Sequence, residues 1–259
     1  MKVALLQMDI ALGDVAANRR KAEAMLAEGL ARGARLFVLP ELWTTGYKLA
    51  EIDRLAEPAD GQTMAMLTAF ARGHGVEIIS GSIAEAREGR VYNTCYAIGA
   101  DGAVVTRYSK IHLIGLMAED RYLAPGDSRA VFELSFGPAG MIICYDLRFT
   151  ELPRAMALEG CRTLFVPAEW PASRGSHWRA LNIARAIENQ MFVIAVNRVG
   201  CDEANVFYGH SLAVDPWGEV LAEGSEACEE VLVVDVDFAA GEEIRRRMPV
   251  FADRRPQLY

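Results

Sequence analysis

The stretch Met141-Ile142-Ile143-Cys144-Tyr145-Asp146-Leu147-Arg148-Phe149 places a cysteine directly after a short apolar run. The run 141–143 predicts a buried β-strand, and the pattern of residues 151–158 predicts a helix soon after it. A cysteine in a strand-to-helix turn exposes its thiol, and the backbone N–H groups of such a turn point toward whatever the thiol attacks. The stretch therefore favours a nucleophilic Cys144, although such a cysteine can also be a small apolar core residue.

Strand-like runs and helical patterns alternate along the whole chain. The predicted strands are 3–8, 36–39, 76–79, 92–98, 104–108, 131–136, 141–143, 164–166, 192–196, 211–214, 219–221 and 231–236. The predicted helices are one that follows Asp14 and ends at Gly33, and those at 63–72, 151–158, 176–190 and 242–247. The glycine-containing segment 137–140 is predicted to separate two strands. Since no linker or repeat interrupts the pattern, residues 1–259 are predicted to form one α/β domain with helices covering the sheets from outside.

Chemically useful side chains follow several of these strands. Glu41, Lys110 and Cys144 each stand at the carboxyl end of an apolar run, as does the pair Glu169-Trp170. Because α/β sheets gather ligands outside the carboxyl ends of their strands, we expect these groups to meet in one crevice. A carboxylate can take the proton of a thiol, and an ammonium group favours thiolate and stabilises an oxyanion, so the set suits acyl transfer. Taken singly, Glu41 could cap a helix or pair with an arginine, and Lys110 could be a solvated strand end.

The composition argues against several classes of protein. Of the 259 residues, 52% are hydrophobic and 24% are charged, which is an ordinary globular composition. Lys and Arg number 27 against 35 Asp and Glu, and this net charge of -8 makes nucleic acid and anionic lipid unlikely partners. The five cysteines are widely spaced without a C-x-x-C pair, a pattern that predicts neither a disulfide framework nor a structural zinc site.

The N-terminal apolar run is interrupted by Asp9, which leaves it too short for a secretion signal. No stretch approaches the ~20 apolar residues that a membrane span needs. Free thiols suit a reducing compartment. These features predict a cytoplasmic protein without a membrane partner.

Three motifs resemble those of the nitrilase superfamily of carbon–nitrogen hydrolases. They surround a glutamate (Pro40-Glu41-Leu42-Trp43-Thr44-Thr45-Gly46-Tyr47), a lysine (Ser109-Lys110-Ile111-His112-Leu113) and a cysteine (the segment 142–149). They occur in the family order, and the similarity covers nearly the whole chain. The resemblance implies a four-layer α-β-β-α sandwich, in which two sheets face each other and helices lie outside. It also implies a homodimer or larger homo-oligomer packed through the cysteine-bearing side.

The resemblance further implies hydrolysis of a small-molecule amide through a cysteine thioester. The roles that it implies are general base for Glu41, oxyanion stabiliser for Lys110, nucleophile for Cys144 and second oxyanion donor for the backbone N–H of Tyr145. A second family glutamate orients the lysine. Glu119 is the best match for it, and Asp120 is the alternative.

Further segments resemble the ω-amidase branch, whose members hydrolyse the terminal amide of 2-oxoglutaramate and 2-oxosuccinamate. These segments are Glu169-Trp170-Pro171 with Arg174, His177 and Trp178, and residues 184–190, 197–200 and 209–211. Such a substrate carries a carboxylate, so a cationic group should lie at the far end of the pocket. Arg174 is the candidate, with Trp170, His177 and Tyr47 as pocket lining, although Arg174 and His177 could instead face solvent. Arg148, Arg185 and Glu188 are interpreted as structural, and Arg185 and Glu188 could pair because they lie three residues apart on one helix face.

Other functions stay open at this point. The same Glu-Lys-Cys triad would serve an N-carbamoyl amide hydrolase, a deaminated-glutathione amidase or a nitrilase. A Cys–His hydrolase would need His112 beside Cys144, and a non-catalytic ligand-binding module would need neither. Since the sequence holds no metal-ligand cluster and no nucleotide-binding glycine pattern, no cofactor is expected.

Overall fold

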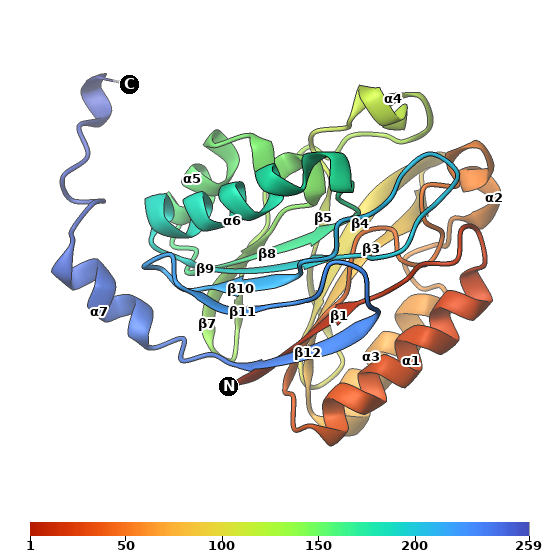
Figure 1. Cartoon of the computed structure of the whole chain (residues 1–259), viewed down its shortest axis with the longest axis horizontal. Helices are drawn as coiled ribbons and strands as arrows, with labels where there is room; N and C mark the ends of the chain where they lie inside the picture. Colours follow the sequence, from red (N-terminus) through yellow and green to blue (C-terminus); the bar gives the residue numbers. More distant parts are fainter. Residues whose placement is uncertain (259) are drawn as a thin grey trace.

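Two six-stranded sheets lie face to face in the computed structural model, which describes residues 1–258 (Figure 1). The predicted domain limit at residue 259 lies outside the described residues. The first sheet has the order β12 (Glu230–Asp235), β1 (Lys2–Gln7), β2 (Leu36–Val38), β3 (Glu77–Arg87), β4 (Arg90–Ile98) and β5 (Val104–Ser109). The second has the order β11 (Val220–Glu223), β10 (Leu212–Val214), β9 (Phe192–Asn197), β8 (Thr163–Ala168), β7 (Gly137–Met141) and β6 (Val131–Leu134). In each sheet the central strands pair in parallel and the outer strands pair antiparallel.

Helices cover the outer face of each sheet (Figure 1). The helices α1 (Val15–Ala31) and α3 (Gln62–His74) lie against the first sheet, and α5 (Glu151–Leu158) and α6 (Gly175–Asn189) lie against the second. The short helices α2 (Ile52–Leu55) and α4 (Glu119–Tyr122) lie near one end of the sandwich, and α7 (Ala240–Arg247) lies outside it near the C-terminus. The predicted four-layer α-β-β-α sandwich is confirmed.

Alternation along β1 explains why this strand needs cover on both faces. Val3 and Leu5 belong to the core cluster between the sheets, whereas Ala4 and Leu6 belong to the cluster beneath α1 and α3. Because successive side chains of a strand point to opposite faces, one apolar strand contributes to both cores. Within residues 1–258, no helix combines the length and the apolar character needed to cross a membrane.

The strand before the cysteine lies earlier than the sequence predicts. β7 spans Gly137–Met141, so the segment 137–140, predicted as a separator, is itself the strand. Its partner β6 ends at Leu134, two residues before the predicted limit, and Leu134 pairs with Gly137. A Cβ at Gly140 would lie 2.4 Å from Cε of Met156 in α5 and 3.1 Å from Sγ of Cys161, so the strand is closely packed at this point. The prediction was wrong because Gly140 serves close packing, and the turn between the two strands lies at residues 135–136.

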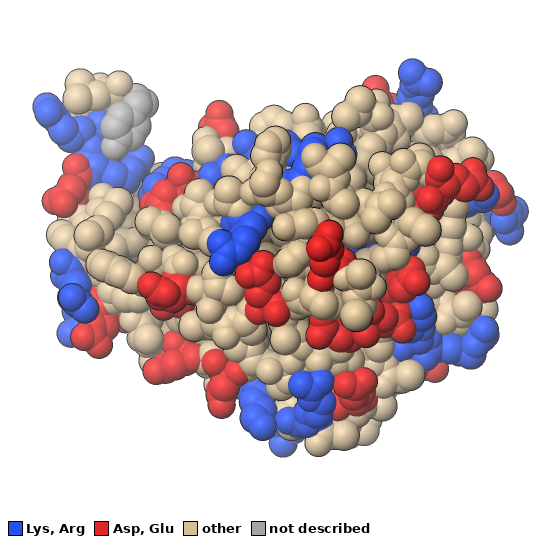
Figure 2. Space-filling view, in the orientation of Figure 1, with Lys and Arg blue, Asp and Glu red and all other residues tan. Residues whose placement is uncertain are grey.

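The exposed charges on one face of the molecule are mixed. Figure 2 shows Lys and Arg side chains interspersed with Asp and Glu rather than gathered into one broad patch. A protein that follows a phosphate backbone usually presents a continuous cationic surface. The face in Figure 2 does not present one.

Candidate active site

A buried lysine joins two carboxylates from separate parts of the chain. Lys110 follows β5, and its Nζ donates to Oε1 of Glu41 at 2.8 Å and to Oε1 of Glu119 at 2.7 Å. All three side chains are fully buried. Glu41 comes from the loop after β2, and Glu119 is the first residue of α4. The fold thus brings together groups that are up to 78 residues apart in sequence.

The loop that carries Glu41 is tightly held against β3. Its Leu42 has a φ of 38°, and the N–H of Leu42 donates to Oγ of Ser82 at 2.9 Å. Gly81 lies so close that a Cβ would stand 2.2 Å from the carbonyl oxygen of Pro40. Only glycine permits this approach, and Gly81 also has a φ of +63°. The position of Glu41 is therefore set by backbone packing.

The carboxylate of Glu41 is surrounded by donors. Its Oε1 accepts from Lys110, from Nδ2 of Asn93 at 2.8 Å and from the hydroxyl of Tyr47 at 3.1 Å. Its Oε2 accepts from the backbone N–H of Glu169 at 2.9 Å. Donors that favour the ionised form also fix the direction of the carboxylate. Asn93, on β4, is a member of the site that sequence reasoning missed.

Glu119, rather than its neighbour Asp120, contacts the lysine. Oε1 of Glu119 accepts from Lys110 and from the hydroxyl of Tyr47 at 2.7 Å, and Oε2 accepts from the N–H of Ile114 at 2.8 Å. Asp120 is exposed. Tyr47 was expected as pocket lining, but its hydroxyl contacts both glutamates. Burial and the two carboxylates raise the pKa of Tyr47 well above its usual value, so this phenol stays a neutral donor.

Lys110 keeps its charge despite burial. Burial by itself lowers the pKa of Lys110, but Glu119 and Glu41 together hold it well above its usual value. The pKa of Glu119 is raised, because burial and the nearby Glu41 outweigh the lowering effect of Lys110. A single ammonium between two carboxyl groups therefore stays protonated and remains available to stabilise negative charge.

Cys144 occupies a strained turn. It begins the 3-10 helix η3 (Cys144–Arg148), and its φ of 46° lies in the left-handed region, which typically costs a non-glycine residue about 1–3 kcal/mol. The turn is held by Asp146, whose Oδ2 accepts from the N–H of Ile143 at 3.0 Å and from the hydroxyl of Tyr108 at 2.6 Å. Arg185 of α6 donates twice to the carbonyl of Leu147. Such bonds let the fold keep a strained residue in place.

The thiol of Cys144 is protonated at rest. Burial and the nearby Glu41 raise the pKa of Cys144 well above its usual value, and the opposing effect of Lys110 is smaller. Because the thiolate is the nucleophilic form, the proton must leave as the thiol attacks. The charged groups with the largest effects on its pKa are Glu41, Lys110 and Glu119.

A narrow pocket opens onto Cys144. Its lining residues are Ile114, Met117, Cys144, Tyr145, Arg148, Glu169, Trp170, Pro171 and Arg174. The centre of a water molecule can occupy only about 10 Å³ of it, so the pocket holds about one water. Any larger ligand therefore requires these side chains to move.

Three predicted pocket residues line this cavity, namely Tyr145, Trp170 and Arg174. His177 does not: it lies in the first turn of α6, where it is exposed, and its Nδ1 lies 3.3 Å from Nη1 of Arg148. Its exposed position matches the alternative that His177 faces solvent, because the helix buries its neighbour Trp178 instead. Arg148, which was interpreted as structural, lines the pocket.

Two arginines, Arg148 and Arg174, line the pocket. The guanidinium of Arg148 stacks over the ring of Trp170 at 4.6 Å. Burial and the like charge of Arg174 lower the pKa of Arg148. Among residues 1–258, neither arginine forms an ion pair with a carboxylate. Two adjacent cations without an acidic partner form a site suited to an anion.

Other polar contacts assign roles to residues that the sequence left open. His112 contacts Asp146 through its N–H and through Nδ1, and its ring stacks on Phe149 with 3.6 Å between centroids. The expected pair of Arg185 and Glu188 is present at 2.8 Å. No group of three or more His, Cys, Asp or Glu side chains that could hold a metal ion occurs in residues 1–258.

Comparison with known proteins identifies the family of this chain. The model of the family described as carbon-nitrogen hydrolase matches residues 2–246. The chain belongs to the carbon–nitrogen hydrolase family. Several relatives in this family are named as amidases, and the chain is an amide-hydrolysing enzyme.

Individual relatives of this carbon–nitrogen hydrolase cover nearly all of it. The 2-oxoglutaramate amidase of Bacillus subtilis (strain 168) is 44% identical over 99% of this chain and 98% of its own. Omega-amidase NIT2 of Homo sapiens is 35% identical over 100% of this chain and 96% of its own. A solved CN-hydrolase superfamily protein from Xanthomonas campestris, with an arsenic adduct in its active site, is 34% identical. It superimposes with a TM-score of 0.91 over 98% of this chain and 97% of its own. The predicted resemblance to ω-amidases is confirmed.

Proposed function

We propose that this enzyme hydrolyses the ω-amide of 2-oxoglutaramate or 2-oxosuccinamate to carboxylate and ammonia through a thioester on Cys144. The observation that carries the proposal is the set of residues that line one pocket, which includes Cys144 and the cations of Arg148 and Arg174. A linear substrate with a carboxylate at one end and an amide at the other matches both features. The names of the Bacillus and human relatives support the same substrate class.

Acylation begins with the Cys144 thiol. Glu41 takes the thiol proton as the sulfur attacks the amide carbon, which becomes tetrahedral. Lys110 and the backbone N–H of Tyr145 stabilise the oxyanion that forms. Glu119 orients Lys110 by accepting from its Nζ at 2.7 Å, and the hydroxyl of Tyr47 accepts from the same Nζ at 3.5 Å. The arsenic adduct in the Xanthomonas active site supports a soft ligand such as a thiol at this place.

The intermediate then loses ammonia. The carbon–nitrogen bond breaks, the carbonyl reforms as a thioester, and the nitrogen takes the proton from Glu41 and leaves as NH₃. Water attacks the thioester carbon while Glu41 takes a proton from this water. The carbon–sulfur bond breaks, the acid leaves, and the proton on Glu41 returns to the sulfur of Cys144.

The first test is ammonia release from 2-oxoglutaramate, measured beside N-carbamoyl compounds, deaminated glutathione, simple amides and nitriles. We expect turnover that prefers the keto-acid amide and is lost in Cys144→Ala, which removes one sulfur and should retain the fold. Preference for another panel member would reject the proposed substrate while keeping the cysteine. Turnover by Cys144→Ala would reject the thioester.

If the folded protein turns over none of these compounds, the result would favour the non-catalytic binding module. The homodimer or larger homo-oligomer and the cytoplasmic location stay predictions, and light scattering of the purified chain would test the first.

A further inference from the structure

A further buried carboxyl group, that of Glu169, belongs to a residue that lines the same pocket as Cys144. It follows β8 and is fully buried. Its Oε2 accepts from Nη1 of Arg198 at 3.0 Å, but its Oε1 has no hydrogen-bond partner among the described residues. Burying a carboxyl oxygen without a hydrogen-bond donor costs free energy, and such an atom in a pocket wall is often one to which a ligand donates. The scheme above gives Glu169 no role.

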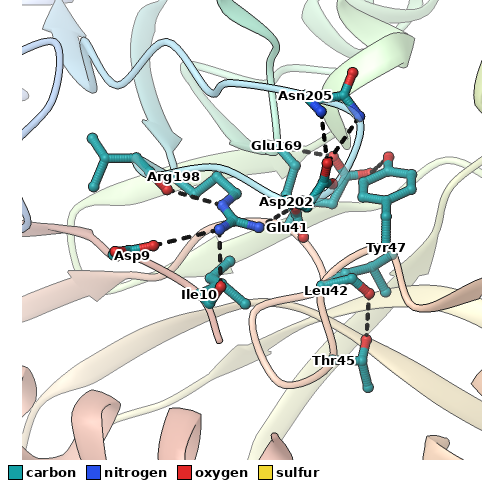
Figure 3. A network of polar contacts seen from close by, with 12 residues as sticks. Asp9, Ile10, Glu41, Leu42, Thr45, Tyr47, Glu169, Arg198, Asp202 and Asn205 are labelled. Carbon is teal, nitrogen blue, oxygen red and sulfur yellow. Dashed lines mark hydrogen bonds and ion pairs between the residues drawn. The ribbon is translucent and has the colours of Figure 1, made fainter. Parts of the chain in front are cut away.

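Arg198 fixes the side chain of Glu169 from behind. The guanidinium donates to the carbonyl oxygens of Val199 and Ile10 as well as to Glu169, and it stacks over Phe207 at 4.1 Å. Figure 3 shows Arg198 between Asp9 and Ile10 on one side and Glu169 on the other. With Oε2 committed to this buried cation, the free Oε1 has a fixed position.

The backbone of the same residue fixes Glu41. The N–H of Glu169 donates to Oε2 of Glu41 at 2.9 Å. One residue therefore holds the group that exchanges the proton, lines the pocket that contains Cys144, and keeps one buried carboxyl oxygen without a partner among the described residues.

We propose that Oε1 of Glu169 accepts a hydrogen bond from an N–H of the scissile amide and so selects primary amides by their leaving group. This inference rests on the proposed attack of Cys144 on an amide, but it does not depend on which acyl group the substrate carries. A primary amide offers two N–H donors, one for Glu169 and one beside Glu41. An ester offers only lone pairs, which a carboxylate oxygen repels. Glu169 stays covalently unchanged, and the proton of the leaving ammonia still comes from Glu41.

The charges around Glu169 make this preference depend on pH. Burial raises the pKa of Glu169 to about 8, with Arg198 opposing it and with Glu41 and Asp202 adding to it. The ionised form, which accepts the hydrogen bond, therefore increases as the pH rises through about 8. The preference for amide over ester should increase over the same range.

The test compares the best primary amide of the panel with the methyl ester of the same acid. Both form the same thioester, so any difference between them arises from the leaving group. In Glu169→Gln the side-chain oxygen can keep the bond to Arg198, and the NH₂ group then replaces Oε1 with a donor. We expect the amide-to-ester ratio of kcat/KM to fall about tenfold or more, as for loss of a hydrogen bond to a charged group. The rise of this ratio with pH should also disappear.

Glu85→Gln is the matched control. Glu85 is also buried and paired with arginines, Arg87 and Arg107, but it does not line the pocket. We expect its amide-to-ester ratio to equal that of the wild type.

Equal losses on amide and ester in Glu169→Gln, or an unchanged ratio, would overturn the proposal and leave Glu169 a purely structural partner of Arg198. If the wild type does not cleave the ester, the proposal requires Glu169→Gln to gain ester cleavage, and no gain would overturn it. Persistence of amide turnover in Cys144→Ala would instead reject the thioester chemistry, so the two failures are distinguishable.

Discussion

Oδ1 of Asp146 accepts a hydrogen bond from the backbone N–H of His112 at 2.9 Å, and Nδ1 of the same histidine lies 2.8 Å from this oxygen. Asp146 also accepts from Ile143 and Tyr108. This one carboxylate therefore joins the segment that follows Lys110 to the turn that presents Cys144, and it fixes the distance between the two motifs.

Asp146→Asn should weaken both the fold and the reaction. The asparagine side chain has a single acceptor oxygen, so its NH₂ group must face an N–H or a hydroxyl that donates to Asp146 in the wild type. We expect the free energy of unfolding to fall by about 2–4 kcal/mol, the usual cost of breaking a buried polar network. Urea denaturation measures it, with the exposed Asp120→Asn as control. Equal urea midpoints for Asp146→Asn and Asp120→Asn would contradict the role of Asp146 in joining the two motifs.

Glu41→Gln should reduce kcat/KM by at least about a hundredfold, as expected for loss of a general base. The amide of glutamine cannot take the thiol proton, although it occupies the same space among the donors. A Cys–His hydrolase using His112 would show only a mild effect. Steady-state ammonia release separates these outcomes, and circular dichroism verifies that the variant is folded.

The two arginines of the pocket should act mainly on substrate binding. Arg174→Ala and Arg148→Ala should each raise KM for 2-oxoglutaramate by about tenfold or more, because each removes a cation from the carboxylate. KM for an uncharged amide should change little. The exposed His177→Ala is the control and should resemble the wild type on both substrates. Similar effects on charged and uncharged amides would remove the arginines from the carboxylate site.

Alkylation of Cys144 by iodoacetamide should be slow at neutral pH and should accelerate as the pH rises. Burial and Glu41 raise the pKa of the thiol, so the thiolate fraction at neutral pH is small. Glu41→Gln removes a negative charge, lowers the pKa of Cys144 and should increase its alkylation at neutral pH. Peptide mass spectrometry distinguishes Cys144 from the exposed Cys201 and Cys228. A slower reaction in Glu41→Gln would contradict this electrostatic coupling.

Periodicity and motif order were sufficient to predict most strands and helices, because burial patterns along the chain are local properties. They were also sufficient to point to Glu41, Lys110 and Cys144. The sequence did not predict that residues 137–141 form a strand instead of a separator, because the close approach of α5 to Gly140 is a contact between distant segments.

The sequence by itself determined the elements, the family resemblance and the types of reacting groups. Only the tertiary structure decided that Glu119 rather than Asp120 contacts Lys110, that Asn93 donates to Glu41, and that Arg148 lines the pocket while His177 faces solvent. It also decided that Oε1 of Glu169 lacks a partner. The physical reason is that hydrogen bonding and burial depend on which segments meet across the two sheets, and residue spacing along one chain does not contain that information.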